Sequence, residues 1–365
     1  MIYREYGKTG KKLSVLGFGG MRFNQIDNHE ECVKMMVTAA QGGINYFDTA
    51  PGYFETKSET VFGKGFAELR RLGLPYYSAT KTFKQTEKDI RTEIEAQLKR
   101  LDIQAIDFYH IWCITSLENW QERKNNNILE TFRKLKEEGL IKHICVSSHL
   151  TGNKIEELLM EGVFEGVLFG YSPYNFKTRQ AAFNAVRSKH LGAVVMNPLG
   201  GGIIPQHPER FSFLVQYGEK VVPATLHFLW DHKDITVALV GFNDEEQIKE
   251  ALEAVKTYKP RSEKELSDLM SKTSASLEGI CTGCAYCDSC PQEIPIPQFM
   301  DAYNQKLLAK DPVPAKITDR LRWHWGKDGK IAANCTSCGE CEKACTQHIN
   351  IIERLKEVAE AARSA

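Results

Sequence analysis

The chain has 365 residues, 42% of them hydrophobic, which favours one large domain together with a smaller one. Lysine and arginine number 47, as do aspartate and glutamate, so the sequence lacks the positive charge typical of proteins that bind nucleic acids or anionic membranes. The N-terminus has no signal-peptide pattern, and no apolar run reaches the roughly 18 residues of a membrane span, so we expect a cytoplasmic protein.

Short runs of β-branched and aromatic residues alternate with helical patterns as far as residue 258. The strand candidates are centred on Leu16, Phe47, Ser78, Tyr109, Cys145, Phe169, Val195 and Leu239. An open doubly wound sheet is the alternative fold, but the segment LGFGGMRF after the first strand lacks the full GxGxxG spacing of a dinucleotide fold. The pattern therefore favours an α/β fold, a TIM (β/α)8 barrel with parallel strands.

Two helices have the clearest sequence signals. Asn28 and Glu31 form a capping-box-like start for a helix that ends at Gly42 and Gly43. A second helix begins at Thr86 and carries apolar residues on one face, at Ile90, Ile94, Leu98 and Leu101.

The strand pattern stops near Tyr258, and Pro260 precedes a polar helical stretch that leads to a cysteine-rich segment. We therefore predict a barrel domain over residues 1–260 and a small, mainly helical domain over residues 261–365.

The cysteine-rich segment contains 8 of the 11 cysteines. Its first motif reads CTGCAYCDSCP and contributes Cys281, Cys284, Cys287 and Cys290. Its second reads CTSCGECEKACT and contributes Cys335, Cys338, Cys341 and Cys345. The second motif has the spacing of bacterial ferredoxins, except that Thr346 stands where proline is usual. The paired motifs predict a ferredoxin-like domain with two 4Fe-4S clusters.

The ligand pairing of these clusters has two solutions. In two-cluster ferredoxins the fourth cysteine of each motif binds the other cluster. One cluster would then be held by Cys281, Cys284, Cys287 and Cys345, and the other by Cys335, Cys338, Cys341 and Cys290. Local ligation of each motif is the alternative, and a zinc site with four thiolates is a further one. The clusters themselves can relay electrons or stabilise the fold.

The segments GINYFDTAPGYFETKSE and SATK resemble the aldo-keto reductase family, and this resemblance covers roughly residues 1–258. It implies a catalytic role for Asp48, Tyr53 and Lys81. Tyr53 would be the general acid, Lys81 the amine that lowers its pKa, and Asp48 the carboxylate that orients Lys81.

The predicted fourth strand, IDFYHIWCI, departs from the family pattern, because Trp112 stands where the family usually carries its catalytic histidine. Side chains alternate along a strand, so His110 points to the same side as Trp112 from a lower layer. His110 is therefore a candidate catalytic residue, with a satisfied core histidine as the alternative. Trp112 is expected to shape the substrate pocket or to stack on the substrate.

The same resemblance implies a nicotinamide cofactor, NAD(P)H. Within VMNPLGGG, Asn197 and Leu199 are predicted cofactor contacts. The segment VGFNDEEQIKEAL matches the family's adenosine site, with Gly241 and Glu250 as candidate contacts. Gly241 and Gln247 replace the usual basic residues, which leaves a 2′-phosphate uncompensated and favours NADH over NADPH.

A nicotinamide ring in this family stacks on a side chain near the end of a strand. Tyr171 is the natural candidate, although YSPYNF can also be aligned on Tyr174 and Asn175.

Together these features predict an iron-sulfur oxidoreductase that interconverts a small carbonyl compound and an alcohol with a nicotinamide cofactor. Hydride transfer moves two electrons and each cluster moves one, yet no flavin motif is recognisable, so a flavoprotein is a possible redox partner. One alternative is an electron-transfer or redox-sensing protein whose barrel docks a partner. Another is a nonredox lyase or isomerase with structural clusters.

Overall fold

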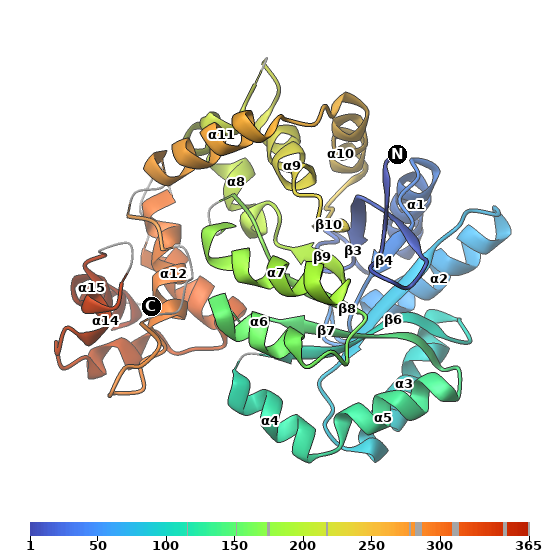
Figure 1. Ribbon diagram of the computed structural model, residues 1–365, viewed down its shortest axis with the longest axis horizontal. Coiled ribbons are helices and arrows are strands. Elements are labelled where there is room, and N and C mark those ends of the chain that lie inside the picture. Colours follow the sequence, from blue (N-terminus) through green and yellow to red (C-terminus); the bar gives the residue numbers. More distant parts are fainter. Residues whose placement is uncertain are drawn as a thin grey trace. The chain divides into compact units, whose positions relative to one another are not determined.

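The computed structural model describes the chain except for residues 115, 151, 174–175, 217, 277–278, 282–286, 309–313, 346–348 and 364–365. The described residues form two units (Figure 1). The first contains Met1–Tyr171, Ala181–Pro198 and Val222–Arg261, and the second contains Ser172–Gln180, Leu199–Val221 and Ser262–Ala365. These units describe packing, so the domain limits of 1–260 and 261–365 stay a prediction.

The first unit is built around a closed barrel of parallel strands (Figure 1). In order around the barrel these are β10 (Val237–Gly241), β3 (Leu16–Gly19), β4 (Tyr46–Asp48), β5 (Tyr77–Thr82), β6 (Ile106–Ile114), β7 (Ile141–Ser148), β8 (Gly166–Gly170) and β9 (Gly192–Met196). Each predicted strand centre lies in one of them. The predicted TIM barrel is confirmed.

Helices surround this barrel in the first unit (Figure 1). They are α1 (His29–Gln41), α2 (Lys57–Arg71), α3 (Glu87–Leu101), α4 (Leu117–Asn125), α5 (Ile128–Glu137), α6 (Gly152–Met160), α7 (Gln180–Lys189), α9 (Val221–Asp231) and α10 (Glu245–Thr257). Both predicted helix starts are present. Asn28 Oδ1 accepts from the backbone amide of Glu31, and Thr86 Oγ1 accepts from that of Asp89, both at 3.2 Å.

A short antiparallel hairpin, β1 (Tyr3–Glu5) with β2 (Lys12–Ser14), precedes the barrel. Tyr6 follows β1, and its ring lies 4.5 Å from that of Phe108 inside the barrel. A Cβ at Gly166 or Gly192 would lie within 2.5 Å of Tyr6 ring atoms. These two positions therefore admit only glycine while Tyr6 fills this end of the barrel.

The barrel interior changes from apolar to polar along the strands. Its buried cluster consists of Tyr6, Leu13, Tyr46, Ala79, Phe108, Cys145, Leu168, Val194, Val237 and Leu239. Asp48 pairs with Ala79, and Lys81 pairs with His110, in the strand register. Because side chains alternate along each strand, Asp48, Lys81 and His110 face the interior just above this cluster. The polar layer lies toward the C-terminal ends of the strands, where barrel enzymes carry their sites.

The second unit is mainly helical. It contains the one-turn helix α8 (Ile203–Gln206), then α11 (Glu263–Ser276), α12 (Ile296–Leu308), α13 (Pro314–Asp319), α14 (Glu340–Lys343) and α15 (Ile351–Arg363), with a π-helix at Arg320–Trp325 and 3-10 helices at Phe176–Arg179, Gly200–Gly202, Pro208–Leu214 and Gly329–Asn334. Its core includes Phe299 and Leu355, packed with the buried cysteines Cys287, Cys341 and Cys345. None of the helices in the described part of the chain has the length and hydrophobicity needed to cross a membrane.

Candidate active site and cluster sites

Asp48 and Lys81 form a buried ion pair at the C-terminal ends of β4 and β5. Lys81 Nζ donates to Asp48 Oδ1 at 2.5 Å and to the carbonyl oxygen of Thr49 at 2.9 Å, and the two side chains are 1% and 2% exposed. Burial raises the pKa of Asp48 and lowers the pKa of Lys81, while each charge offsets the effect on its partner. The remaining oxygen, Asp48 Oδ2, is buried and has no hydrogen-bond partner within the described residues.

A second buried carboxylate supports this pair from outside the barrel. Glu59 of α2 is fully buried, accepts from Thr80 Oγ1 at 2.7 Å and pairs with Arg100 at 2.6 Å. Gln97 of α3 donates to Glu59 Oε1 and to the carbonyl oxygen of Lys81, at 3.1 and 2.9 Å. The charge of Glu59 also raises the pKa of Lys81, against the larger effect of burial. Sequence reasoning assigned no role to Glu59, although it lies within the FETKSE segment.

Tyr53 lies half-buried beside the ion pair. Lys81 Nζ is 5.3 Å from the centre of its ring, and the ring of Trp112 meets it edge-on at 5.9 Å. Phe83 stacks on Trp112 at 3.7 Å between ring centres and is 48% exposed. The structure thus brings together Asp48, Tyr53 and Lys81, and walls them with two aromatic rings.

The protonation of Tyr53 differs from the sequence-based expectation. Burial raises the pKa of Tyr53 well above its usual value, and the charge of Asp48 adds to this. Arg22 acts in the opposite direction. The resemblance predicts that Lys81 lowers this pKa, whereas burial and the charge of Asp48 raise it in the structure. Tyr53 is therefore protonated at neutral pH.

His110 lies fully buried, in the layer of Lys81. Its Nε2 is 3.5 Å from Tyr46 Oη, at the outer limit of a hydrogen bond, and its Nδ1 has no partner among the described residues. Burial and, to a smaller extent, the charge of Lys81 lower the pKa of His110 to about 3, so the ring is neutral. His110 and Trp112 point into the barrel together, and after them the strand is irregular, with Cys113 at a φ of 65°.

Tyr171 follows β8 but packs away from the candidate site. Its ring is fully buried against Phe183 of α7, at 5.1 Å, and its hydroxyl lies 2.9 Å from His232 Nε2. Protein side chains therefore enclose this ring in the structure, and its stacking on a nicotinamide stays a prediction. The alternative alignment falls on Tyr174 and Asn175, which lie outside the described residues.

The predicted contacts after β9 fall in different units. Asn197 is half-buried and adopts a left-handed conformation, with a φ of 54°. Leu199 belongs to the second unit, where its carbonyl oxygen accepts from the amide of Ile204 at 3.2 Å. The left-handed turn at Asn197 therefore ends β9 with an irregular backbone, of the kind that carries binding groups in barrel enzymes.

The C-terminal end of β10 carries a cation that the sequence did not reveal. A Cβ at Gly241 would lie 2.5 Å from Cγ of Arg22, because the aliphatic part of the Arg22 side chain packs over this glycine. Arg22 is exposed and has no ion pair or hydrogen bond of its side chain in the part of the chain that the structure describes. Gln247 instead serves the local fold, since its Oε1 accepts from the amide of Asn243 at 3.0 Å. Glu250 lies half-buried on α10.

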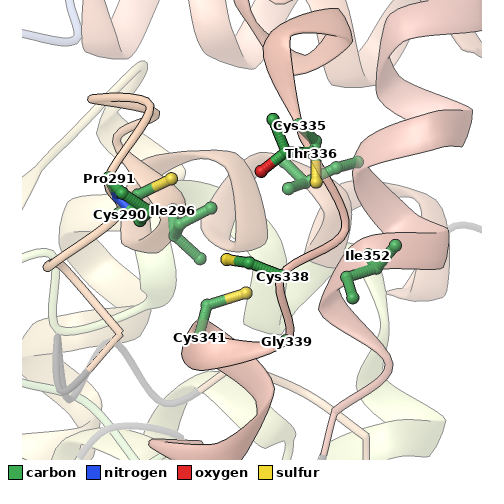
Figure 2. A pocket seen from close by; sticks show the side chains of 10 residues that line it. Cys290, Pro291, Ile296, Cys335, Thr336, Cys338, Gly339, Cys341 and Ile352 are labelled. Carbon is green, nitrogen blue, oxygen red and sulfur yellow. The ribbon is translucent and has the colours of Figure 1, made fainter.

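Four of the predicted cluster ligands line one cavity of the second unit. Cys290, Cys335, Cys338 and Cys341 surround it together with Ile296 and other residues. Figure 2 shows the sulfurs of Cys290, Cys338 and Cys341 directed into the space between their segments. The fourth cysteine of the first motif thus lies with the first three of the second motif.

The remaining cysteines within the described residues lie in or against the core of the second unit. Cys287 and Cys345 are buried in the core of the unit, with Cys281 packed against it. Asn304 fixes Cys281 through two hydrogen bonds to its backbone, each 2.9 Å long. Cys281 and Cys345 both raise the pKa of Arg354, as expected of thiols that lie near the same guanidinium. Cys284 and Thr346 lie outside the described residues.

Comparisons with known proteins agree with this architecture. Residues 15–272 match the aldo/keto reductase family, and residues 280–350 match a 4Fe-4S dicluster domain. L-galactose dehydrogenase of Arabidopsis thaliana is 27% identical over 284 residues, which cover 69% of this chain and 87% of that protein. NADH-specific methylglyoxal reductase of Escherichia coli is 26% identical over 227 residues, which cover 54% of this chain and 67% of that protein.

A solved structure shares the fold. The holo form of an aldo-keto reductase from Bacillus halodurans superposes with a TM-score of 0.64 and 23% identity, over 75% of this chain and 96% of that one. The family match extends over most of the chain and includes the strand ends that hold Asp48, Tyr53 and Lys81. The chain therefore belongs to the aldo/keto reductase family, as an NAD(P)-dependent oxidoreductase that also carries a 4Fe-4S dicluster domain.

Proposed function

We propose that the barrel interconverts a small carbonyl compound and its alcohol, with Tyr53 as the proton donor. The observation that carries this proposal is the buried Asp48–Lys81 pair beside the half-buried Tyr53. Members of the family act on small carbonyl substrates, and the aromatic walls of Trp112 and Phe83 suit a compact organic group.

The residues at the strand ends fit a nicotinamide dinucleotide. Arg22 offers a guanidinium with no partner in the described residues, beside the bare backbone of Gly241. Asn197 would provide a further contact after β9, with Leu199 and Glu250 as additional candidates. A bound nicotinamide supplies or accepts the hydride.

The proton chemistry is assigned to this chain's own residues. Negative charge develops on the carbonyl oxygen during reduction, and the Tyr53 hydroxyl gives its proton to that oxygen. Lys81, 5.3 Å from the ring centre, stabilises the negative charge left on the phenolate, and Asp48 holds Lys81 in place. His110 is neutral at neutral pH, so any role in catalysis would use the neutral ring and not the imidazolium cation. Trp112 would orient the substrate.

For the second unit we propose two 4Fe-4S clusters with crossed ligation. Cys290, Cys335, Cys338 and Cys341 would hold one cluster, and Cys281, Cys284, Cys287 and Cys345 the other. The common cavity of the first set supports this pairing over local ligation. We assign the clusters an electron-relay role toward a one-electron partner such as a flavoprotein, with stabilisation of the fold as the alternative.

A second candidate function rests on Trp112. This residue occupies the position of the family's usual histidine, which favours a barrel that docks a redox partner and keeps only part of the reductase chemistry. Carbonyl turnover distinguishes the two candidates.

The test uses anaerobically purified protein with NADH, NADPH and a panel of aldehydes and ketones. We expect carbonyl-dependent oxidation of the nicotinamide, and slow bleaching of the cluster absorbance by NADH alone, because no flavin divides the hydride into single electrons. Dithionite should bleach the clusters directly. Absence of turnover with every carbonyl would favour the docking function, whereas fast bleaching by NADH would require a direct route between the two centres.

A second prediction concerns the cofactor. We expect NADH to bind at least as well as NADPH, with Arg22 contacting the pyrophosphate that both share. Arg22→Gln should weaken the binding of both cofactors by about 10- to 100-fold, since a hydrogen bond to a charged group contributes about 1.5–3 kcal/mol. Fluorescence titration measures both dissociation constants, and Arg71→Gln, which removes an exposed arginine paired with Glu68, is the matched control. Weakening of NADPH alone would assign Arg22 to the 2′-phosphate and reverse the expected preference.

A further inference from the structure

Arg354 is a half-buried cation in the interior of the second unit. It lies on α15, and its guanidinium carbon is 4.8 Å from the ring centre of Tyr303 on α12. Its Nη1 is buried and has no hydrogen-bond partner within the described residues. A buried N–H group without an acceptor is costly, so this position calls for an acceptor that the protein residues described do not provide.

The groups around Arg354 indicate what that acceptor is. A Cβ at Gly279, two residues before Cys281, would lie 3.6 Å from Arg354 Nη2, so the guanidinium lies beside the start of the first cysteine motif. In agreement with this position, Cys281 and Cys345 raise the pKa of Arg354, as do Tyr303 and Glu357, against the larger effect of burial. Both cysteines belong to the proposed ligand set of one cluster, which we call the first cluster. Its thiolates and sulfides carry negative charge and accept hydrogen bonds.

The other cluster site differs in the kind of cation near it. Cys338 raises the pKa of Lys343, but Lys343 is exposed and forms an ion pair with Glu340 at 2.8 Å. The cavity of the second cluster, the one proposed for Cys290, Cys335, Cys338 and Cys341, has no lysine or arginine among its lining residues. The two sites thus have the same ligand type and different electrostatic surroundings.

We propose that Arg354 donates its unpaired N–H to a sulfur of the first cluster and gives that cluster a higher reduction potential than the second. Reduction adds one electron to the cluster without breaking a bond. A nearby cation stabilises the reduced form more than the oxidised form, because the reduced form is more negative. An electron delivered by a one-electron donor therefore settles on the first cluster. This inference rests on the proposed ligand sets and is independent of the chemistry in the barrel.

The test is a redox titration of the anaerobic full-length protein with dithionite, followed by electron paramagnetic resonance. Arg354→Met keeps an apolar stem against Tyr303 and removes both the charge and the N–H groups. We expect the reduction equilibrium of one cluster to fall about tenfold, equal to about 59 mV for a one-electron couple, with the other cluster unchanged. Arg363→Met, at an exposed position of the same helix, is the matched control and should change neither potential.

A second variant separates tuning from structural support. Arg354→Lys retains the charge, so its shift should be smaller than that of Arg354→Met while the iron content stays the same. Unchanged potentials in Arg354→Met, or equal shifts of both clusters, would overturn the proposal. Loss of iron from both variants without a potential shift in the remaining clusters would also overturn it, because Arg354 would then be a structural residue. Carbonyl turnover is measured alongside, so a failure of the barrel function is recognised separately.

Discussion

Replacing Tyr53 with phenylalanine is expected to lower kcat for carbonyl reduction by about 10²–10⁴-fold, the usual contribution of a positioned general acid. The change removes only the hydroxyl, and the ring can keep its edge-on contact with Trp112 and its place beside Lys81. Cofactor affinity and cluster content should stay unchanged, because neither depends on the Tyr53 hydroxyl. Steady-state kinetics with NADH, together with iron analysis, measure these quantities.

Tyr76→Phe is the matched control for this experiment. The Tyr76 ring stacks on Phe66 at 4.4 Å and its hydroxyl accepts from Arg70, so the same chemical change is made outside the candidate site. Undiminished turnover of Tyr53→Phe would transfer the acid role to another group, with His110 as the next candidate. His110 is neutral above its pKa of about 3, so a role for it would show no change of protonation near neutral pH.

The sequence predicted those features that depend on strand order and side-chain alternation. Every strand of the barrel follows from a local pattern, and the ends of β4 and β5 bring Asp48 and Lys81 together because parallel strands end at the same face. The interior position of His110 follows from the same alternation. Trp112 likewise contacts Tyr53, as expected of a residue that shapes the pocket.

The features that the sequence did not reveal depend on which side chains meet across elements. Gly241 stands where the family usually has a basic residue, which suggests that a cation is missing. Its lack of a side chain instead makes room for Arg22, from a segment more than two hundred residues away. Tyr171 has the expected place after its strand, but packing against α7 decides which way its ring points. Glu59 supports Lys81 through Gln97, a contact that requires the register of two helices and a strand.

The cysteine spacing left the ligand pairing open for a similar reason. Either fourth cysteine can reach its own motif or the other one, and only the folded chain brings Cys290 to the cavity of Cys335, Cys338 and Cys341. Cysteine variants test this pairing directly. The native protein is expected to contain about eight iron and eight acid-labile sulfide per chain, from two four-iron clusters.

Replacing Cys290 with alanine should reduce the iron content to about four per chain, since removing a ligand destabilises one cluster. The double variant of Cys290 and Cys335 should lose no more iron than the single Cys290 variant, because crossed ligation assigns both cysteines to the second cluster. The double variant of Cys290 and Cys281 should lose nearly all iron, because it affects both clusters. Local ligation predicts the opposite result. The Cys290 and Cys281 variant would then keep about four iron, because both residues would bind one cluster, and the Cys290 and Cys335 variant would lose nearly all iron.

The first cluster can be tested in the same way. Crossed ligation gives it Cys345 as its ligand from the second motif. The double variant of Cys345 and Cys281 should keep about four iron, and its remaining cluster should have the potential assigned to the site without an arginine. Cys32→Ala, a cysteine of α1 in the barrel, controls for the loss of a thiol as such. Stoichiometric zinc in the native protein, or iron that does not follow these pairs, would reject the assignment. If the pairs behave as expected, Arg354 acts on the cluster of Cys281 and Cys345. The two clusters then differ in potential because the first lies beside the half-buried Arg354, whereas Lys343 near the second is exposed and paired with Glu340.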